Sequence, residues 1–191
     1  ELKRAAEQLM AEGPAGEVVF HTVDLGDRKS VSALADHAIK TLGGVDIFIG
    51  NAVFDVLTGA AIEQITDDVV DKLHQVNIGA NVSLMRAFLP RMRKNKWGRI
   101  IFSSSTTSLR SSANDGMGIY GGSKSALNAI ARAAATEVGH DGITVNTILL
   151  GVFKTQMLVD TYNVIDKAQG TAAAKAFMDS FTSMSALGRL A

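Results

Sequence analysis

Short apolar runs rich in β-branched residues alternate along the chain with longer segments in which apolar positions recur every three or four residues. This alternation is typical of parallel strands connected by crossover helices. Each predicted strand ends where Gly, Asn, Asp or Ser replaces the apolar residues, and the strands are Val18–Val23, Val45–Ile49, Arg99–Phe102 and Ile143–Leu149. The pattern predicts an α/β fold with a sheet buried on both faces, and ligands bind at the carboxyl ends of such strands.

Helical periodicity covers four segments, namely Glu1–Met10, Lys29–Leu42, Thr66–Met92 and Tyr120–Val138. Thr66 is suited to cap the longest of them, and Asp67 and Asp68 in its first turn are favourable to the helix dipole. Tyr120–Val138 is rich in Ala and other small residues, so a neighbouring helix can approach it closely.

After Gly151 the alternation stops, and residues 153–191 form a Met- and Phe-rich segment predicted as short helices broken at Gly170. We expect one domain over residues 1–191, in which residues 153–191 form a substrate lid over the strand ends. The alternative is a set of peripheral helices whose Met and Phe side chains only pack in the core.

Composition narrows the possible partners. The 191 residues are 47% apolar and 20% charged, with 19 basic and 19 acidic side chains, so they lack the basic excess of nucleic-acid-binding proteins. No apolar run is long enough to cross a membrane, and the first residues lack a secretion signal. There is no Cys, and the four His are far apart, which argues against a metal site. We expect a cytoplasmic protein without a bound metal.

Candidate chemistry is concentrated in the segment Tyr120–Lys124. Two residues four apart lie on one face of a helix, which places the ammonium of Lys124 beside the phenol of Tyr120. Lowering a tyrosine pKa from near 10 to about 7 needs roughly 4 kcal/mol, and one ammonium about 5 Å away contributes roughly 3 kcal/mol. Upstream, the strand Arg99–Phe102 runs directly into Ser103, Ser104 and Ser105. The sequence therefore predicts a proton donor and a hydroxyl group at one edge of the sheet.

In this order these residues resemble the short-chain dehydrogenase/reductase family. Further landmarks of the resemblance are Val23-Asp24-Leu25, Gly50-Asn51-Ala52, Val76-Asn77-Ile78, the segment from Asn146 through Gly151, and Thr155. The resemblance covers nearly the whole chain. It implies a Rossmann-type doubly wound parallel sheet in three α/β/α layers. It also implies a dehydrogenase/reductase that transfers a hydride between NAD or NADP and a carbonyl or secondary alcohol.

The resemblance assigns a role to each candidate catalytic residue. Tyr120 would exchange a proton with the substrate oxygen, while Lys124 lowers the pKa of Tyr120 and binds the nicotinamide ribose. Ser105 would hold the same oxygen, with Ser104 as the alternative, because the loop before Tyr120 is slightly longer than is usual in the family. Asn77 would interrupt its helix and anchor a water that joins Lys124 to solvent.

The cofactor-binding residues that the resemblance implies are Asp24, Leu25, Asn51, Ala52, Tyr120, Lys124, Gly151 and Thr155. Asp24 would accept from the adenine amino group beside the backbone of Leu25, although a simple turn aspartate is the alternative. Asn51 would brace the sheet, Ala52 would lie near the ribose, and Thr155 would bind the nicotinamide carboxamide. Three positions depart from the family pattern, since Gly50 replaces an Asn, Val53 replaces a Gly, and Leu150 replaces the Pro before Gly151.

The sequence contains no Gly-rich turn for the pyrophosphate and no residue that would select NAD or NADP. We therefore expect further chain upstream of Glu1 and a last strand beyond Ala191.

The helices Thr66–Met92 and Tyr120–Val138 are expected to pair subunits into a homo-oligomer, a dimer or tetramer. The alternatives to an oxidoreductase are an epimerase or dehydratase on the same scaffold, or a catalytically silent nucleotide-binding module.

Overall fold

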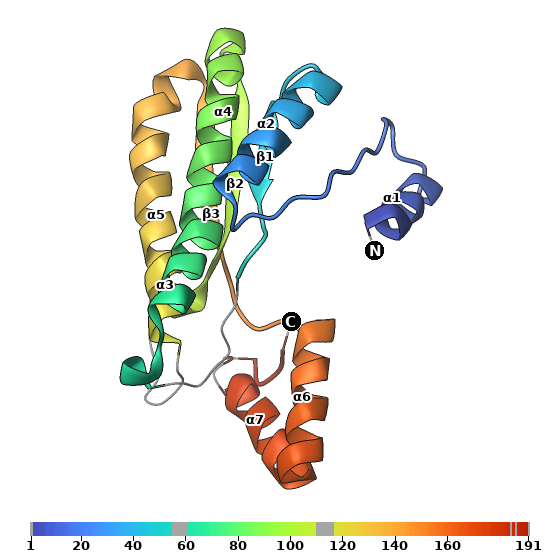
Figure 1. Cartoon of the computed structure of the whole chain (residues 1–191), viewed down its shortest axis with the longest axis vertical. Helices are drawn as coiled ribbons and strands as arrows, with labels where there is room; N and C mark the ends of the chain where they lie inside the picture. The colour runs from blue at the N-terminus through green and yellow to red at the C-terminus, as the bar shows by residue number, and fades with distance from the viewer. Residues whose placement is uncertain (1, 55–60, 110–116, 184, 186, 191) are drawn as a thin grey trace. The chain divides into compact units, whose positions relative to one another are not determined.

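The computed structural model describes residues 2–54, 61–109, 117–183, 185 and 187–190, and the chain divides into two compact units, Glu1–Ile148 and Leu149–Ala191. A three-stranded sheet of order β1-β2-β3 is formed by Ile47–Gly50, Gly98–Ser105 and Ile143–Leu150 (Figure 1). β1 and β2 run parallel, as the alternation of apolar runs predicts.

The helices of the first unit are α1 (Leu2–Ala11), α2 (Arg28–Leu42), α3 (Asp67–His74), α4 (Ala80–Asn95) and α5 (Gly118–Val138). Short turns complete it, namely the 3₁₀ turns η1 (Ile62–Gln64), η3 (Thr106–Ser108) and η4 (Gly139–Asp141) and the π turn η2 (Gln75–Gly79). All four predicted helices are present, and the longest is divided by η2 into α3 and α4.

Local sequence signals set the helix ends. Asp27 caps α2 by accepting hydrogen bonds from the backbone N–H groups of Lys29 at 3.0 Å and Ser30 at 3.3 Å. Gly43 ends α2 in the left-handed conformation, at φ 69°. Thr66 occupies the N-cap of α3 as predicted, but its side chain makes no capping hydrogen bond.

The predicted strand Val18–Val23 is wrong for the part of the chain that the structure describes. These residues form no regular element, and Val19 and Phe20 are exposed. β-branched residues favour a strand only when a neighbouring strand pairs with them, and no described residue pairs with this segment. The local pattern was therefore insufficient to form the strand.

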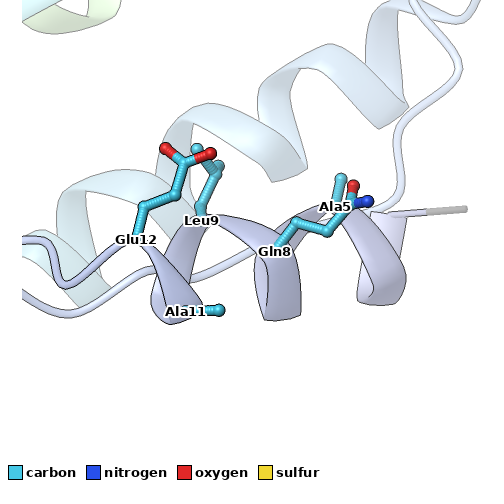
Figure 2. A pocket seen from close by; sticks show the side chains of 5 residues that line it. All are labelled: Ala5, Gln8, Leu9, Ala11 and Glu12. Atoms are coloured by element: carbon cyan, nitrogen blue, oxygen red, sulfur yellow. The ribbon is translucent and has the colours of Figure 1, made fainter.

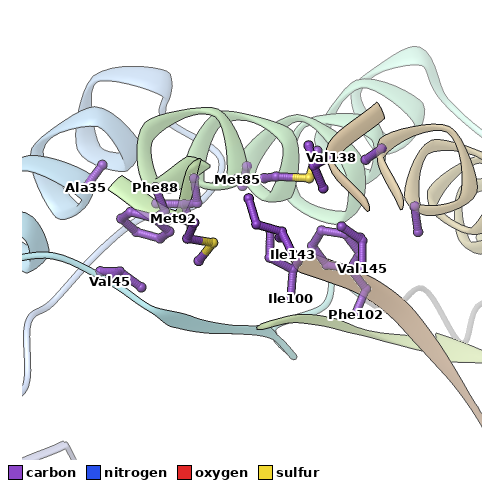
Figure 3. Close-up of a cluster of buried hydrophobic side chains, with 14 of the residues drawn as sticks. Ala35, Val45, Met85, Phe88, Met92, Ile100, Phe102, Val138, Ile143 and Val145 are labelled. Carbon is purple, nitrogen blue, oxygen red and sulfur yellow. The ribbon is translucent and has the colours of Figure 1, made fainter. Parts of the chain in front are cut away.

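The hydrophobic core lies between the sheet and the helices α2, α4 and α5 (Figure 3). Side chains along β2 alternate, so that Ile100 and Phe102 are fully buried in this core. The prediction of a sheet buried on both faces is wrong for β1. On the face of β1 opposite this core, Ile47 and Ile49 are 56% and 59% exposed.

The second unit contains α6 (Gln156–Gln169) and α7 (Thr171–Ser183), which pack against each other. The break between them falls at Gly170, as predicted, where φ is 89°. Leu158 and Ala174 are buried within this unit. None of the helices in the described part of the chain combines the length and apolar character needed to span a bilayer.

An ion cluster connects the C-terminal ends of α4 and α5. The carboxylate of Asp141 in η4 accepts a hydrogen bond from Arg93 Nη1 at 2.7 Å and another from Lys96 Nζ. Arg93 also binds Glu137 on α5 at 2.6 Å. The hydrogen bond from Lys96, followed by the nearby positive charges, holds the pKa of Asp141 below its usual value, although burial acts in the opposite direction.

The lowered pKa of Asp141 predicts a pH-dependent loss of stability in the variant Asp141→Asn. The carboxylate stabilises the fold above its unfolded-state pKa of about 3.9, and this contribution disappears as the pH falls through the lower folded-state value. The variant should therefore have a smaller free energy of unfolding than the parent at pH 7, and the difference should shrink toward pH 3. Urea unfolding across this range measures it.

Glu137→Gln is the matched control, because the Glu137 side chain is 70% exposed and that of Asp141 only 6%. An exposed ion pair contributes about 0–1 kcal/mol, so this variant should have little effect. Equal losses in both variants at every pH would show that the cluster does not act through Asp141.

Candidate active site

The carboxyl ends of β1 and β2 meet at one edge of the sheet. Gly50 lies opposite Phe102 in the parallel register, so the chain continues there into Asn51 and Ser103. The hydroxyl of Ser103 donates a hydrogen bond to Oδ1 of Asn51 at 2.7 Å. This bond connects the two strand ends.

Helix α5 brings the predicted Tyr–Lys pair to the same edge. Lys124 is 4% exposed, and its Nζ donates a hydrogen bond to the backbone carbonyl of Ser103 at 2.7 Å. The same Nζ lies 5.7 Å from the centroid of the Tyr120 ring. A buried ammonium requires polar partners, and here a strand-end carbonyl provides one beside the phenol ring.

Asn77 lies in the π turn η2, where the family resemblance implies an interruption of the helix. Its side chain is fully buried and contacts the segment that follows β1. Oδ1 accepts from the backbone N–H of Phe54 at 2.8 Å, and Nδ2 donates to the Phe54 carbonyl at 3.1 Å and to Ser123 Oγ at 3.1 Å. Asn77 therefore connects three segments, in the kind of turn that is frequent at functional sites.

Ser123 was missed by sequence reasoning. Its buried hydroxyl donates to the Tyr120 carbonyl at 2.7 Å and accepts from Asn77. A continuous hydrogen-bonded path therefore runs from Phe54 through Asn77 and Ser123 to Tyr120. The only sequence signal was a small polar residue directly before Lys124 in an Ala-rich helix.

The three serines at the end of β2 occupy different environments. Ser104 is 3% exposed, and its Oγ has no hydrogen-bond partner among the described residues. Ser105 is only partly buried, and its Oγ accepts from Thr107 N at 3.2 Å and from Thr107 Oγ1 at 2.9 Å. Ser103 is bonded to Asn51.

The turn η3 after Ser105 is bonded to α5. Ser108 Oγ donates to the Ser105 carbonyl at 2.6 Å and accepts from Asn128 Nδ2 at 2.9 Å. Ser125 Oγ donates to the Ser108 carbonyl at 2.8 Å. A Cβ on Gly121 would lie 2.8 Å from the Thr107 carbonyl oxygen, so the close approach of η3 to α5 requires glycine there.

The structure gives a physical reason for Gly50, which stands where the family pattern has an Asn. A Cβ at this position would collide with the side-chain amide of Asn81 and lie 2.7 Å from Cδ1 of Phe102. Asn81 is itself buried, and its Nδ2 donates to the Asn77 carbonyl at 2.9 Å. Sequence reasoning also missed Asn81, whose only signal was a polar residue within the apolar face of the helix.

Asp24 and Leu25 lie in the turn before α2. Asp24 Oδ1 accepts from the Gly26 N–H at 2.8 Å. Asp24 therefore forms a simple turn, which was the alternative to its role as an adenine acceptor. The Leu25 carbonyl accepts from Gln75 Nε2 at 3.3 Å, which connects this turn to η2. Ala52 is exposed, directly after Asn51.

Gly151 and Thr155 belong to the second unit. Thr155 caps α6, and its hydroxyl accepts from the Leu158 N–H at 3.4 Å. Much of the loop between Ser105 and Tyr120, residues 110–116, lies outside the described residues.

A surface pocket lies elsewhere and includes none of the predicted site residues. Its lining comes from α1 and the residue after it, namely Ala5, Gln8, Leu9, Ala11 and Glu12 (Figure 2). Within the described ranges, no group of three or more His, Asp or Glu side chains is placed to hold a metal ion.

Comparison with known proteins identifies the family. The family model for short chain dehydrogenases matches residues 1–164. The chain belongs to the short-chain dehydrogenase family. Among curated relatives, an uncharacterised oxidoreductase of Mycobacterium bovis is 30% identical over 173 residues, which are 87% of this chain and 48% of the relative. Dehydrogenase/reductase SDR family member 4 of Sus scrofa is 32% identical, over 80% of this chain and 53% of that protein. The chain thus spans about half the length of these relatives.

Solved structures show the same fold. L-sorbose reductase from Gluconobacter frateurii, complexed with NADPH and L-sorbose, matches 100% of this chain and 70% of its own chain, with a TM-score of 0.88 and 27% identity. A metagenomic short-chain oxidoreductase in complex with NADP matches 81% of this chain and 67% of its own, with a TM-score of 0.71 and 27% identity. The predicted Rossmann-type doubly wound fold is confirmed.

A buried ammonium beside a phenol ring, as found at this edge of the sheet, is chemically suited to the hydroxyl groups of a nicotinamide ribose. Lys124 Nζ lies at the carboxyl edge, bonded to the Ser103 carbonyl and near the Tyr120 ring, and Asn51 and Ala52 are exposed after β1. The Gly-rich turn for the pyrophosphate is not part of this sequence. The residues present therefore fit one half of the cofactor.

The contact between η3 and α5 predicts opposite effects for two adjacent glycines. Gly122→Ala should raise the free energy of unfolding by about 0.5–1 kcal/mol, because alanine favours a helix and a Cβ there meets no atom within 4 Å. Gly121→Ala should lower it by about 1–3 kcal/mol, because the Cβ presses on the Thr107 carbonyl. Urea unfolding measures both, and a stabilising Gly121→Ala would contradict the close packing.

Proposed function

We propose that this chain provides the catalytic part of an NAD(P)-dependent oxidoreductase that interconverts a carbonyl and a secondary alcohol. The observation that carries the proposal is the position of Lys124 Nζ, bonded to the Ser103 carbonyl and 5.7 Å from the Tyr120 ring centroid. NADPH or NADP is present in the two structural neighbours described above, which supports a nicotinamide cofactor for this chain. Either NAD or NADP is consistent with the proposal.

Tyr120 is the proposed general acid and base. In the reductive direction its hydroxyl donates a proton to the substrate oxygen as negative charge develops there. The neighbouring ammonium of Lys124 favours the phenolate and so lowers the pKa of Tyr120 toward neutrality. When bound, the reduced nicotinamide supplies the hydride to the carbonyl carbon.

Ser105 is the proposed second donor to the substrate oxygen. A donor already in place stabilises the developing oxyanion more than it stabilises the neutral carbonyl, and it therefore accelerates the reaction. Its partial exposure supports Ser105 over Ser104, whose hydroxyl is buried. Asn77 is proposed to anchor a water that connects Lys124 to solvent.

The cofactor-binding roles of the remaining residues are part of the same proposal. Asp24 and the Leu25 backbone would contact the adenine, while Asn51 would brace the sheet beside the cofactor and Ala52 would lie near the ribose. Gly151 and Thr155 would contact the nicotinamide end. The proposed contact of Asp24 with the adenine is compatible with the turn that Asp24 makes, because a carboxylate accepts several hydrogen bonds.

The substrate is proposed to be a small molecule, with residues 153–191 as the lid over it. The apolar Phe177 and Phe181 of α7, which pack edge to face at 4.9 Å, would give this lid an apolar surface. Association into a dimer or homotetramer through the helices predicted at Thr66–Met92 and Tyr120–Val138, and a cytoplasmic location, stay predictions.

Removing the phenol hydroxyl tests the proposed acid and base. Tyr120→Phe in the full-length protein should lower kcat for a ketone by about 10²–10⁴-fold, because the proton donor is lost. The dissociation constant for NADPH or NADH, measured by fluorescence titration, should stay nearly unchanged. Unaltered turnover would refute the mechanism. Absence of turnover with any ketone in the parent protein would favour the epimerase, dehydratase or silent-module alternatives.

The two candidate serines make a matched pair. Ser105→Ala should lower kcat by about 10²–10³-fold, because it removes a donor to the oxyanion. Ser104→Ala should leave kcat within about twofold and should not destabilise the chain, because the hydroxyl it removes is buried without a described partner. Steady-state kinetics with both variants decides the assignment, and the reverse pattern would transfer the role to Ser104.

A further inference from the structure

The hydrogen bonds of Ser105 determine what its hydroxyl can still do. A serine hydroxyl has one hydrogen to donate and two lone pairs that accept. Thr107 provides donors to both lone pairs, one from its backbone N–H at 3.2 Å and one from Oγ1 at 2.9 Å. When the Thr107 hydroxyl donates to Ser105 Oγ, the hydrogen of Ser105 is left to donate to another group.

The turn that contains Thr107 is fixed relative to the catalytic helix. The next residue, Ser108, is bonded to the Ser105 carbonyl, to Asn128 and to Ser125. Asn128 and Ser125 lie on α5, the helix that also carries the Tyr–Lys pair. Thr107 thus holds Ser105 from a turn that is fastened to the helix supplying the proton.

We infer that Thr107 is a positioning residue that keeps Ser105 in the donor state toward the substrate oxygen. The inference rests on the proposed function, in which Ser105 donates to that oxygen. Without the threonine hydroxyl, one lone pair of Ser105 is open, and its hydrogen can turn toward other acceptors. The substrate oxygen then meets a donor that is correctly oriented for only part of the time.

Thr107→Val tests the inference because it keeps the shape and the backbone N–H of the residue and replaces only the hydroxyl with a methyl group. In the full-length protein, kcat for a ketone should fall about threefold to tenfold, the value of one neutral hydrogen bond. The KM for the reduced cofactor should not change. Thr107→Ser restores the hydroxyl and should restore kcat. Thr106→Val makes the same change one residue earlier and should leave kcat at the parent value.

A double-mutant cycle separates positioning from a general structural effect. If Thr107 acts through Ser105, then Thr107→Val in a Ser105→Ala background should cause no further loss of kcat. The pH profile of kcat should keep its midpoint in Thr107→Val, because the Tyr–Lys pair that sets it is unchanged. Thermal unfolding of each variant shows whether the fold is retained.

Three outcomes would overturn the inference. If Ser105→Ala lowers kcat and Thr107→Val does not, then Thr107 has no positioning role and the proposed function stands. If Thr107→Val lowers kcat equally in both backgrounds, its effect does not pass through Ser105. If Ser105→Ala is itself without effect, then the proposed role of Ser105 fails and this inference fails with it.

Discussion

A single buried cation organises the candidate active site. An ammonium that loses water must gain polar partners, and Lys124 gains the Ser103 carbonyl at the end of β2. This requirement fixes the first turns of α5 against the sheet edge and places Tyr120 and Lys124 together there. The apolar core beneath, with Ile100 and Phe102 on the same strand, gives that edge a rigid support.

A second constraint comes from backbone N–H and carbonyl groups that no helix or sheet hydrogen bond satisfies, so that side chains bond them instead. Phe54 follows β1, and its N–H and carbonyl are both bonded by the amide of Asn77, much as a neighbouring strand would bond them. The π turn places Asn77 where its amide can also contact Ser123. The π turn, the segment after β1 and helix α5 are thereby connected through the side chain of Asn77.

The structural features that depend on residues close together in the chain could be predicted from the sequence. The helix periods, the break at Gly170 and the placement of Lys124 beside Tyr120 follow from residues close together in the sequence, whereas the interruption at Asn77 was expected from the family resemblance. The strand expected at Val18–Val23 failed because pairing is a long-range property. Ser123 and Asn81 were missed for a related reason, since each matters through a partner or a neighbour brought close by folding, and a lone polar residue carries no such signal.

The packing of Gly50 against Asn81 has a consequence for relatives of this chain. The volume at the carboxyl end of β1 has room for one side-chain amide. In this chain the amide comes from Asn81 of α4 rather than from a residue of β1. A relative with a larger residue on the strand side has to accept a smaller one on the helix side. These two positions should therefore covary across homologues, as alternative ways of filling the same volume.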